Sequence, residues 1–181
     1  MSGHGHVDPS NKKIALLISL LALSLAISET LGNSVQIQAL SKNIEASNLW
    51  SFFQAKTIRM TTLRAAADAI ESANSVSEKQ SAVAKKMRDD IKRYDSEPET
   101  GEGRKELAER AKAAESARDR ALAAHHHYEL ASAITQIGIV VASASIVVSM
   151  SVLGWIGLGA GLLGIAFIVL GYVAPTAMHL F

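Results

Sequence analysis

Three apolar stretches of this chain each carry a row of small residues, and these rows constrain the fold more than any other feature. The small residues recur at steps of four and three positions, which places them along one face of a helix. Small side chains let helix backbones approach closely, which is how helices associate in lipid. We therefore expect an all-α integral membrane protein with three transmembrane helices. The rows are Ala15, Ser19, Ala22 and Ala26, followed by Glu29 and Asn33; Ala131, Thr135, Gly138, Ala142, Ser145 and Ser149; and Gly157, Gly161, Gly164 and Gly171.

The length of the apolar stretches supports this expectation, because a spanning helix needs about 20 apolar residues. Residues 134–153 and 155–174 contain no charged side chain, which predicts a helical hairpin with a tight turn at Gly154. Trp155 and Tyr172 lie near the ends of the last stretch, where aromatic rings favour the headgroup region. The expected division is a His-bearing N-terminus at 1–12, transmembrane helices at 13–33, 131–153 and 154–175, a charged helical region at 34–130, and a tail at 176–181.

The first apolar stretch has two interpretations. Lys12 and Lys13 before an apolar run that ends in small residues are typical of a cleavable secretory signal. The small-residue row continues through Glu29 and Asn33, past any such cleavage site, which favours an uncleaved anchor. The two lysines also favour a cytoplasmic N-terminus, with the charged middle region in the periplasm.

The middle of the chain holds sixteen of the eighteen Lys and Arg residues, between Ser41 and Glu129. Apolar residues at heptad spacing on both sides of residues 95–103 predict an extramembrane coiled hairpin whose turn is this Pro- and Gly-containing segment. The outgoing arm would then be about twice as long as the returning arm. A break is therefore expected, at residues 72–77 or as a bend at residues 41–47.

Composition and motifs exclude several functions. The net charge of +1 indicates no nucleic-acid partner, and the chain has no Cys for thiol catalysis or thiolate metal sites. No phosphate-binding loop, nucleophile elbow or zinc-protease motif is present. We therefore expect no enzymatic activity and no obligatory cofactor.

The segment Glu45-Ala-Ser-Asn-Leu-Trp-Ser-Phe-Phe-Gln-Ala-Lys-Thr-Ile-Arg59 resembles the signature of the bacterial "domain of unknown function 4337" family. The resemblance extends over nearly the whole chain in the order of its parts: a His-bearing N-terminus, one span, a charged helical region and two closing spans. It implies a multi-pass protein of the bacterial inner membrane, and it implies no activity. The turn before the last span is often basic in this family, whereas residues 150–157 carry no charge here.

Two groups of polar residues near the spans are candidate sites. Glu29 is the only acid within a span, so it marks either a polar path or a solvated headgroup boundary. His125 and Glu129, one helical turn apart, could supply two ligands to a divalent metal, but three consecutive His residues diverge by about 100° and cannot chelate one ion. The alternative is that these His residues simply lie at the membrane interface.

The most distinctive group is aromatic and basic. Three aromatic residues within four positions cannot share one helical face, so at least one should contact another subunit or lipid headgroups unless it packs inside the hairpin. The group consists of Trp50, Phe52, Phe53, Gln54, Lys56 and Arg59.

These features favour a structural or scaffolding protein that forms a homo-oligomer in contact with membrane lipid. An oligomeric channel or transporter, with Glu29 on its path, is the alternative from another class. An accessory subunit of a larger membrane complex is also compatible with the sequence.

Overall fold

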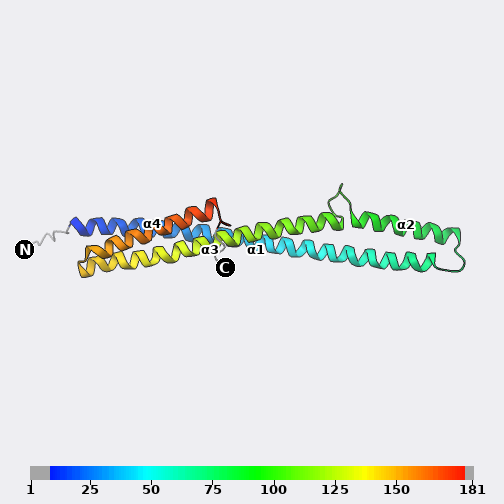
Figure 1. Cartoon of the computed structure of the whole chain (residues 1–181), viewed down its shortest axis with the longest axis horizontal. Coiled ribbons are helices and arrows are strands. Elements are labelled where there is room, and N and C mark those ends of the chain that lie inside the picture. Colours follow the sequence, from blue (N-terminus) through cyan, green and yellow to red (C-terminus); the bar gives the residue numbers. More distant parts are fainter. Residues whose placement is uncertain (1–8, 178–181) are drawn as a thin grey trace, which may run out of the picture. The chain divides into compact units, whose positions relative to one another are not determined.

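The computed structural model describes residues 9–177, and these form four helices and no strand (Figure 1). The helices are α1 (Pro9–Glu71), α2 (Glu78–Asp95), α3 (Arg104–Val148) and α4 (Ser151–Val173). Helices α1, α3 and α4 each contain a segment long and apolar enough to cross a membrane. The all-α class and the three apolar helices are therefore confirmed. Most of the predicted N-terminal tail, with His4 and His6, and residues 178–181 lie outside the described residues.

The chain divides into two compact units. The first unit comprises Met1–Ala39 and Asp119–Phe181, and the second comprises Leu40–Arg118. The first unit contains the apolar segments, and the second contains most of the charged residues.

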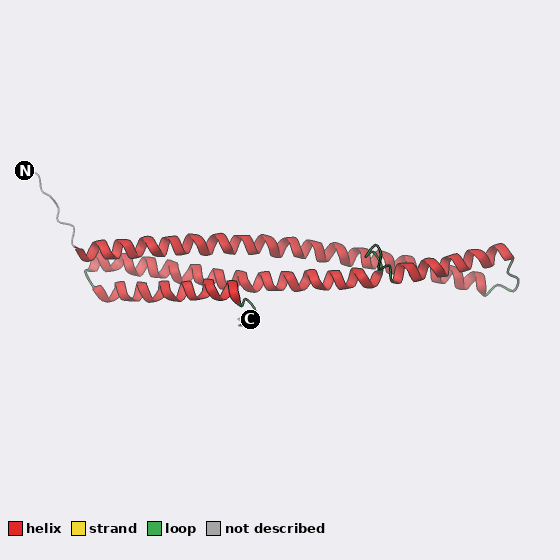
Figure 2. Cartoon of the chain, turned by 90° about the horizontal axis from the view of Figure 1, so that it is seen from above, coloured by secondary structure: helices red, strands yellow, loops and turns green. Residues whose placement is uncertain are grey.

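In the first unit, the apolar parts of α1, α3 and α4 lie side by side (Figures 1 and 2). Helix α4 packs through its buried glycines: a Cβ atom at Gly157 would lie 2.9 Å from the Gly138 carbonyl oxygen, and one at Gly164 would clash with the Thr135 hydroxyl. Such close backbone approach is available only to glycine, so the glycine row of α4 determines how near it lies to α3.

The turn between α3 and α4 lies at Ser149 and Met150, several residues before the expected position at Gly154. Ser149 adopts a left-handed φ of 56°, and the Ser145 hydroxyl donates a hydrogen bond to the Met150 carbonyl oxygen at 3.0 Å. Gly154 is instead helical, and a Cβ atom there would lie 3.5 Å from the Ser145 hydroxyl. A serine pair thus makes the turn, and Gly154 lies within the first turn of α4.

In the second unit, the chain reverses at residues 72–77, one of the two breaks expected from the sequence. Ser77 and Gln80 form a capping box that starts α2. Helix α2 then returns along α1, because Arg88 forms ion pairs with Asp68 and, at 2.6 Å, with Glu71. The outgoing arm therefore ends at Glu71, and α2 with α3 forms the return, which resolves the mismatch in arm lengths.

The segment expected to be the hairpin turn is a loop between α2 and α3 in the returning arm. Gly101 lies in the left-handed region, at φ 67°. The Glu106 carboxylate accepts hydrogen bonds from the Ser96 hydroxyl at 2.6 Å and the Glu97 amide at 3.2 Å. These bonds lower the pKa of Glu106, the bond from Ser96 most of all, and fasten the loop to the start of α3.

Asp95 closes the same loop and makes it sensitive to acid. Its carboxylate accepts from Lys105 Nζ and Arg104 Nη2, each at 2.9 Å, and the pairing with Lys105, then Arg104, lowers the pKa of Asp95. A group whose pKa is lowered in the folded state stabilises fully above its ordinary pKa, and that stabilisation is lost as the pH falls through the folded pKa.

We therefore expect Asp95→Asn to lower the thermal stability of the full chain at neutral pH, and we expect this deficit to shrink at about pH 2, well below the ordinary pKa of Asp. Circular dichroism melts of both chains at the two pH values measure this difference. The same deficit at both pH values would show that the carboxylate charge is not what closes the loop.

The core of the second unit is built mainly from alanine and leucine on α1 and α3. Trp50 packs partly against this core, its indole Nε1 donates to the Glu115 carboxylate at 2.8 Å, and its ring meets Phe53 edge to face at 5.4 Å. Small residues at this contact allow the two helices to lie close together. The buried core residues are Ala46, Leu49, Leu107, Ala111 and Ala114.

Candidate functional site: a polar groove between α1 and α3

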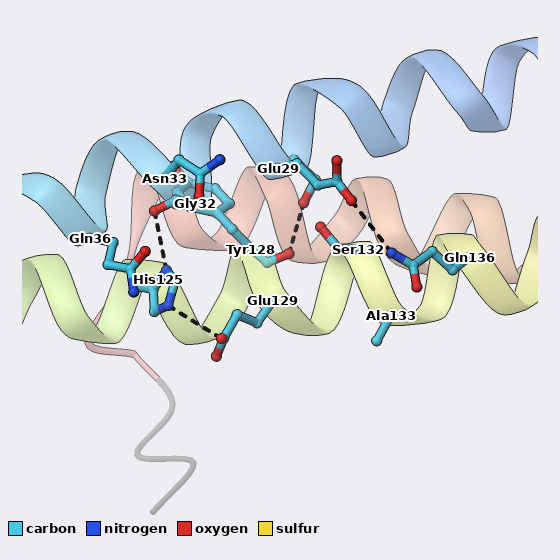
Figure 3. Close-up of a pocket in the computed structure, with 11 residues that line it drawn as sticks. Glu29, Gly32, Asn33, Gln36, His125, Tyr128, Glu129, Ser132, Ala133 and Gln136 are labelled. Atoms are coloured by element: carbon cyan, nitrogen blue, oxygen red, sulfur yellow. Dashed lines mark hydrogen bonds and ion pairs between the residues drawn. The ribbon is translucent and has the colours of Figure 1, made fainter.

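A polar groove of about 490 Å³ lies between α1 and α3 in the first unit (Figure 3). Carboxylates, amides and one imidazole line it, and it contains no Lys or Arg. Helix α1 contributes Ser28, Glu29, Gly32, Asn33 and Gln36, and helix α3 contributes His125, Tyr128, Glu129, Ser132, Ala133 and Gln136.

The floor of the groove is a close contact between the two helices. The hydroxyl of Ser28, which is fully buried, donates to the Tyr128 carbonyl oxygen at 2.8 Å. Gly32 belongs to the same contact: a Cβ atom there would lie 3.5 Å from Tyr128 Cβ and 3.8 Å from His125 Nδ1, which are ordinary van der Waals distances. The His125 ring also lies 3.2 Å from the Gly32 carbonyl oxygen, so its Nδ1 donates that hydrogen bond.

Glu29 and Gln136 form one end of the groove. Both side chains are exposed, and Gln136 Nε2 donates to Glu29 Oε1 at 3.5 Å, the long limit for a hydrogen bond (Figure 3). The sequence analysis did not identify Gln136 as a candidate site residue. Its signal in the sequence is that it is the only amide side chain in the uncharged stretch at residues 134–153.

The three consecutive histidines have three different environments. His125 Nε2 lies 3.3 Å from Glu129, and the exposed His126 lies 3.5 Å from the same carboxylate. His127 points the other way: it is 1% exposed, stacks on Phe167, and its Nε2 donates to the Pro175 carbonyl oxygen at 3.1 Å. This bond ties the end of α4 to α3.

In the proposed metal pair, His125 Nδ1 bonds the Gly32 carbonyl oxygen and His125 Nε2 lies 3.3 Å from the Glu129 carboxylate, so both His125 nitrogens have protein partners. Among the described residues, no group of three or more His, Cys, Asp or Glu side chains is placed to hold a metal ion. His125 and Glu129 could supply two ligands, and any further ligands would have to come from elsewhere.

The small-residue rows differ in their surroundings. On α3, Ala131, Thr135, Gly138, Ala142 and Ser145 are buried, while Ser149 is exposed in the turn; on α4, Gly157, Gly161, Gly164 and Gly171 are all buried. On α1, by contrast, Ala15, Ser19, Ala22 and Ala26 are exposed, and the packed face consists of Leu21, Ser24, Ser28 and Gly32. The row of α1 therefore has no neighbouring helix within the described residues of one chain, and Glu29 and Asn33 extend it to the groove.

The aromatic and basic group lies in the second unit and faces several ways. Trp50 and Phe53 point toward α3, where the Arg104 guanidinium lies over the Phe53 ring at 5.5 Å. Lys56 lies over the Tyr94 ring at 4.9 Å. The exposed members are Phe52, at 63% exposure, together with Gln54 and Arg59.

The arrangement defines an all-helical protein with three helices able to cross a membrane, a charged helical hairpin and a polar groove. The chain belongs to the family described as Domain of unknown function (DUF4337), which matches residues 10–174. The resemblance noted from residues 45–59 is therefore confirmed over nearly the whole chain. No curated protein and no solved structure matches it significantly.

Proposed function

We propose that this protein is a membrane scaffold that self-assembles through the exposed small-residue row of α1, defined as Ala15, Ser19, Ala22 and Ala26. The observation that carries the proposal is the exposure of this row and of the polar residues that extend it. In a bilayer, a lone chain would present Gln136 to lipid. Glu29 would lie nearer the end of the apolar segments, because its neighbour Ser28 contacts Tyr128, which packs on Gly171 near the end of α4.

The depth of the Gln136 side chain makes that exposure costly. Helix α4, at 23 residues, is about 34 Å long, close to the thickness of the hydrocarbon core. Gly138 packs against Gly157 and Ala160, near the middle of α4, so Gln136, two residues away, lies well inside the membrane. A polar group exposed to lipid there costs several kcal/mol, on the order of the cost of an unmade hydrogen bond in hydrocarbon.

The small-residue row of α1 favours a second copy of the chain as the partner that packs on it. Ala15, Ala22 and Ala26 leave room for another backbone, and the Ser19 hydroxyl donates back to the Ala15 carbonyl oxygen, so it needs no outside partner. A neighbouring helix on this face would shield Glu29 at the same time.

A conducting path is less well supported by the same groove. A path needs polar side chains at every depth, and beyond Gln136 the outer face of α3 continues with the exposed Val140 and Val147. The Ser143 hydroxyl in this region donates to the Ile139 carbonyl oxygen of its own helix. Polar contacts thus end part of the way across, which favours packing over transport or catalysis.

The proposal places the protein in the bacterial inner membrane as a multi-pass protein with lipid as its surroundings. Lys12 and Lys13 favour a cytoplasmic N-terminus. The second unit, Leu40–Arg118, would then extend into the periplasm.

Cysteine cross-linking tests the proposal directly, because the chain has no Cys. Oxidation of native membranes that contain Ala22→Cys is expected to give a covalent dimer, since a disulfide needs Cα atoms within about 7 Å. The matched control is Leu20→Cys, 57% exposed on another face of the same turn, which should remain monomeric. Equal cross-linking of the two variants, or a monomeric native mass, would contradict self-assembly through this row.

A further inference from the structure

The outer face of α1 in the second unit carries large aliphatic residues and no charged side chain, although this unit is rich in charge. We name it the outer row: Leu40, Ile44, Asn48, Ser51, Ala55, Ile58 and Thr62, which follow one another at steps of three and four residues. All seven are exposed, and the three large aliphatic members are 60%, 52% and 66% exposed at Leu40, Ile44 and Ile58.

The outer row lies opposite the face that packs on α3. The buried residues of α1 here include Ala46, Leu49 and Met60, which fall about half a helical turn away from the outer row. Helix α1 therefore has, opposite its packed face, a second face with exposed aliphatic residues and no charge, which the hairpin does not cover. A helix with a second apolar face at this spacing is typical of a coiled-coil strand with a further partner.

We propose that the outer row packs in parallel against the outer row of a second copy of this chain. The inference rests on the proposed self-assembly and names the contact that it makes outside the membrane. Two copies inserted through the same N-terminal span have their α1 helices in the same direction, so a parallel pair is the arrangement that one membrane allows.

The residues beside the outer row are compatible with such a pair. One flank carries Glu45 and Arg59, and the other carries Gln54 and Thr61, all exposed. In a parallel pair, each flank meets the opposite flank of the partner. The charged flank then faces an uncharged one, so no like charges meet.

Asn48 supports the choice of an identical partner. It is the one amide in an otherwise aliphatic and small-residue row. A single Asn at a coiled-coil seam fixes the register, because it is satisfied only opposite the equivalent polar residue of its partner. Two copies in register would bring their Asn48 side chains together.

The continuation of the spacing along α1 points to the same partner. The small-residue row of the first unit, Ala15, Ser19, Ala22 and Ala26, has steps of three and four residues. Asn33 follows seven residues after Ala26, and the outer row begins at Leu40, seven residues after Asn33. The proposed contact within the membrane and the contact outside it would therefore follow one residue spacing along α1 (Pro9–Glu71).

Single-cysteine variants of the full chain in native membranes test the inference. Ala55→Cys and Ile58→Cys are expected to form disulfide-linked dimers on oxidation, and the exposed flank variants Gln54→Cys and Thr61→Cys are expected to remain monomeric. If the two sets cross-link equally, or if the adduct has the mass of a different protein, the inference is overturned.

A charge variant provides a second readout that does not depend on disulfide geometry. In the Ala55→Cys background, Ile44→Lys should abolish most of the dimer, because it would bury two lysines at the seam, and Thr61→Lys on the flank should not. Circular dichroism of each variant would check that its helices are retained. An unchanged dimer in Ile44→Lys would overturn the inference.

The outcomes separate this inference from the proposed function. Dimers of Ala22→Cys without dimers of Ala55→Cys would leave self-assembly in the membrane standing and overturn the outer-row contact. Absence of dimers at both positions would overturn both proposals.

Discussion

Replacing Gly157 with Leu is expected to detach α4 from α3, whereas Gly159→Leu leaves the helices packed. A Cβ atom at Gly157 would lie 2.9 Å from both the Gly138 carbonyl oxygen and Ala142 Cβ, neither of which can rotate away. At Gly159 a Cβ atom would meet nothing within 4 Å. Overpacking of a fitted contact typically costs about 1–3 kcal/mol, and a backbone contact belongs at the upper end of that range.

Thermal unfolding of the purified full chain in mild detergent measures this difference. Gly157→Leu should unfold at a clearly lower temperature, and its α3–α4 turn should become accessible to protease. Gly159→Leu, with the same added side chain on the same helix, controls for the change in hydrophobicity. Equal stability of the two variants would show that the close approach of α3 and α4 is not what holds the first unit together.

The second large effect is expected at Ala111 in the core of the second unit. Ala111 has no exposed surface and packs within the core of α1 and α3, so Ala111→Leu forces the two helices apart at a cost of about 1–3 kcal/mol. Ala113, two residues along α3, is exposed, and Ala113→Leu should change the stability by no more than about 0.5 kcal/mol.

Fluorescence of Trp50, recorded in a Trp155→Phe background so that it is the only tryptophan, reports on this core, because its ring packs against the cluster that contains Ala111. Ala111→Leu should lower the denaturant midpoint and shift the emission toward that of exposed tryptophan. A midpoint for Ala111→Leu as high as that of Ala113→Leu would mean that the arms of the hairpin are not closely packed at this position.

Local sequence signals predicted the helices well and their long-range pairing less well. The uncharged stretches, the glycine row and the break at residues 72–77 were all readable, because they depend on composition and short-range spacing. The segment at residues 95–103 was correctly expected to be irregular. Its role was not, because a loop within one arm and a turn between two arms have the same Pro- and Gly-containing composition.

Ion pairs resolve that choice. Arg88 reaches back to Asp68 and Glu71, which makes α2 part of the returning arm, and Asp95 holds Arg104 and Lys105 so that α3 follows α2 in the same arm. Charged residues of these types occur throughout the middle region. The sequence alone therefore does not show which of these charged residues form ion pairs with one another.

The candidate groove illustrates the same limit. Glu29, His125 and Glu129 stood out because ionisable residues near an apolar segment are costly and therefore rare. Their assembly with Asn33 and Gln136 into one cavity depends on the alignment of α1 and α3, which the contacts at Ser28 and Gly32 decide.

The amino-acid sequence alone determined the family, the all-α class, the three apolar helices and the spacing of their small residues, since each depends on residue types at short range. The tertiary structure decided which faces are used. The rows of α3 and α4 are buried, and that of α1 is exposed, because Leu21, Ser24, Ser28 and Gly32 occupy the packed face of α1 instead. Two faces of similar spacing can pack equally well on a single helix, and only the position of its neighbours distinguishes the occupied face from the free one.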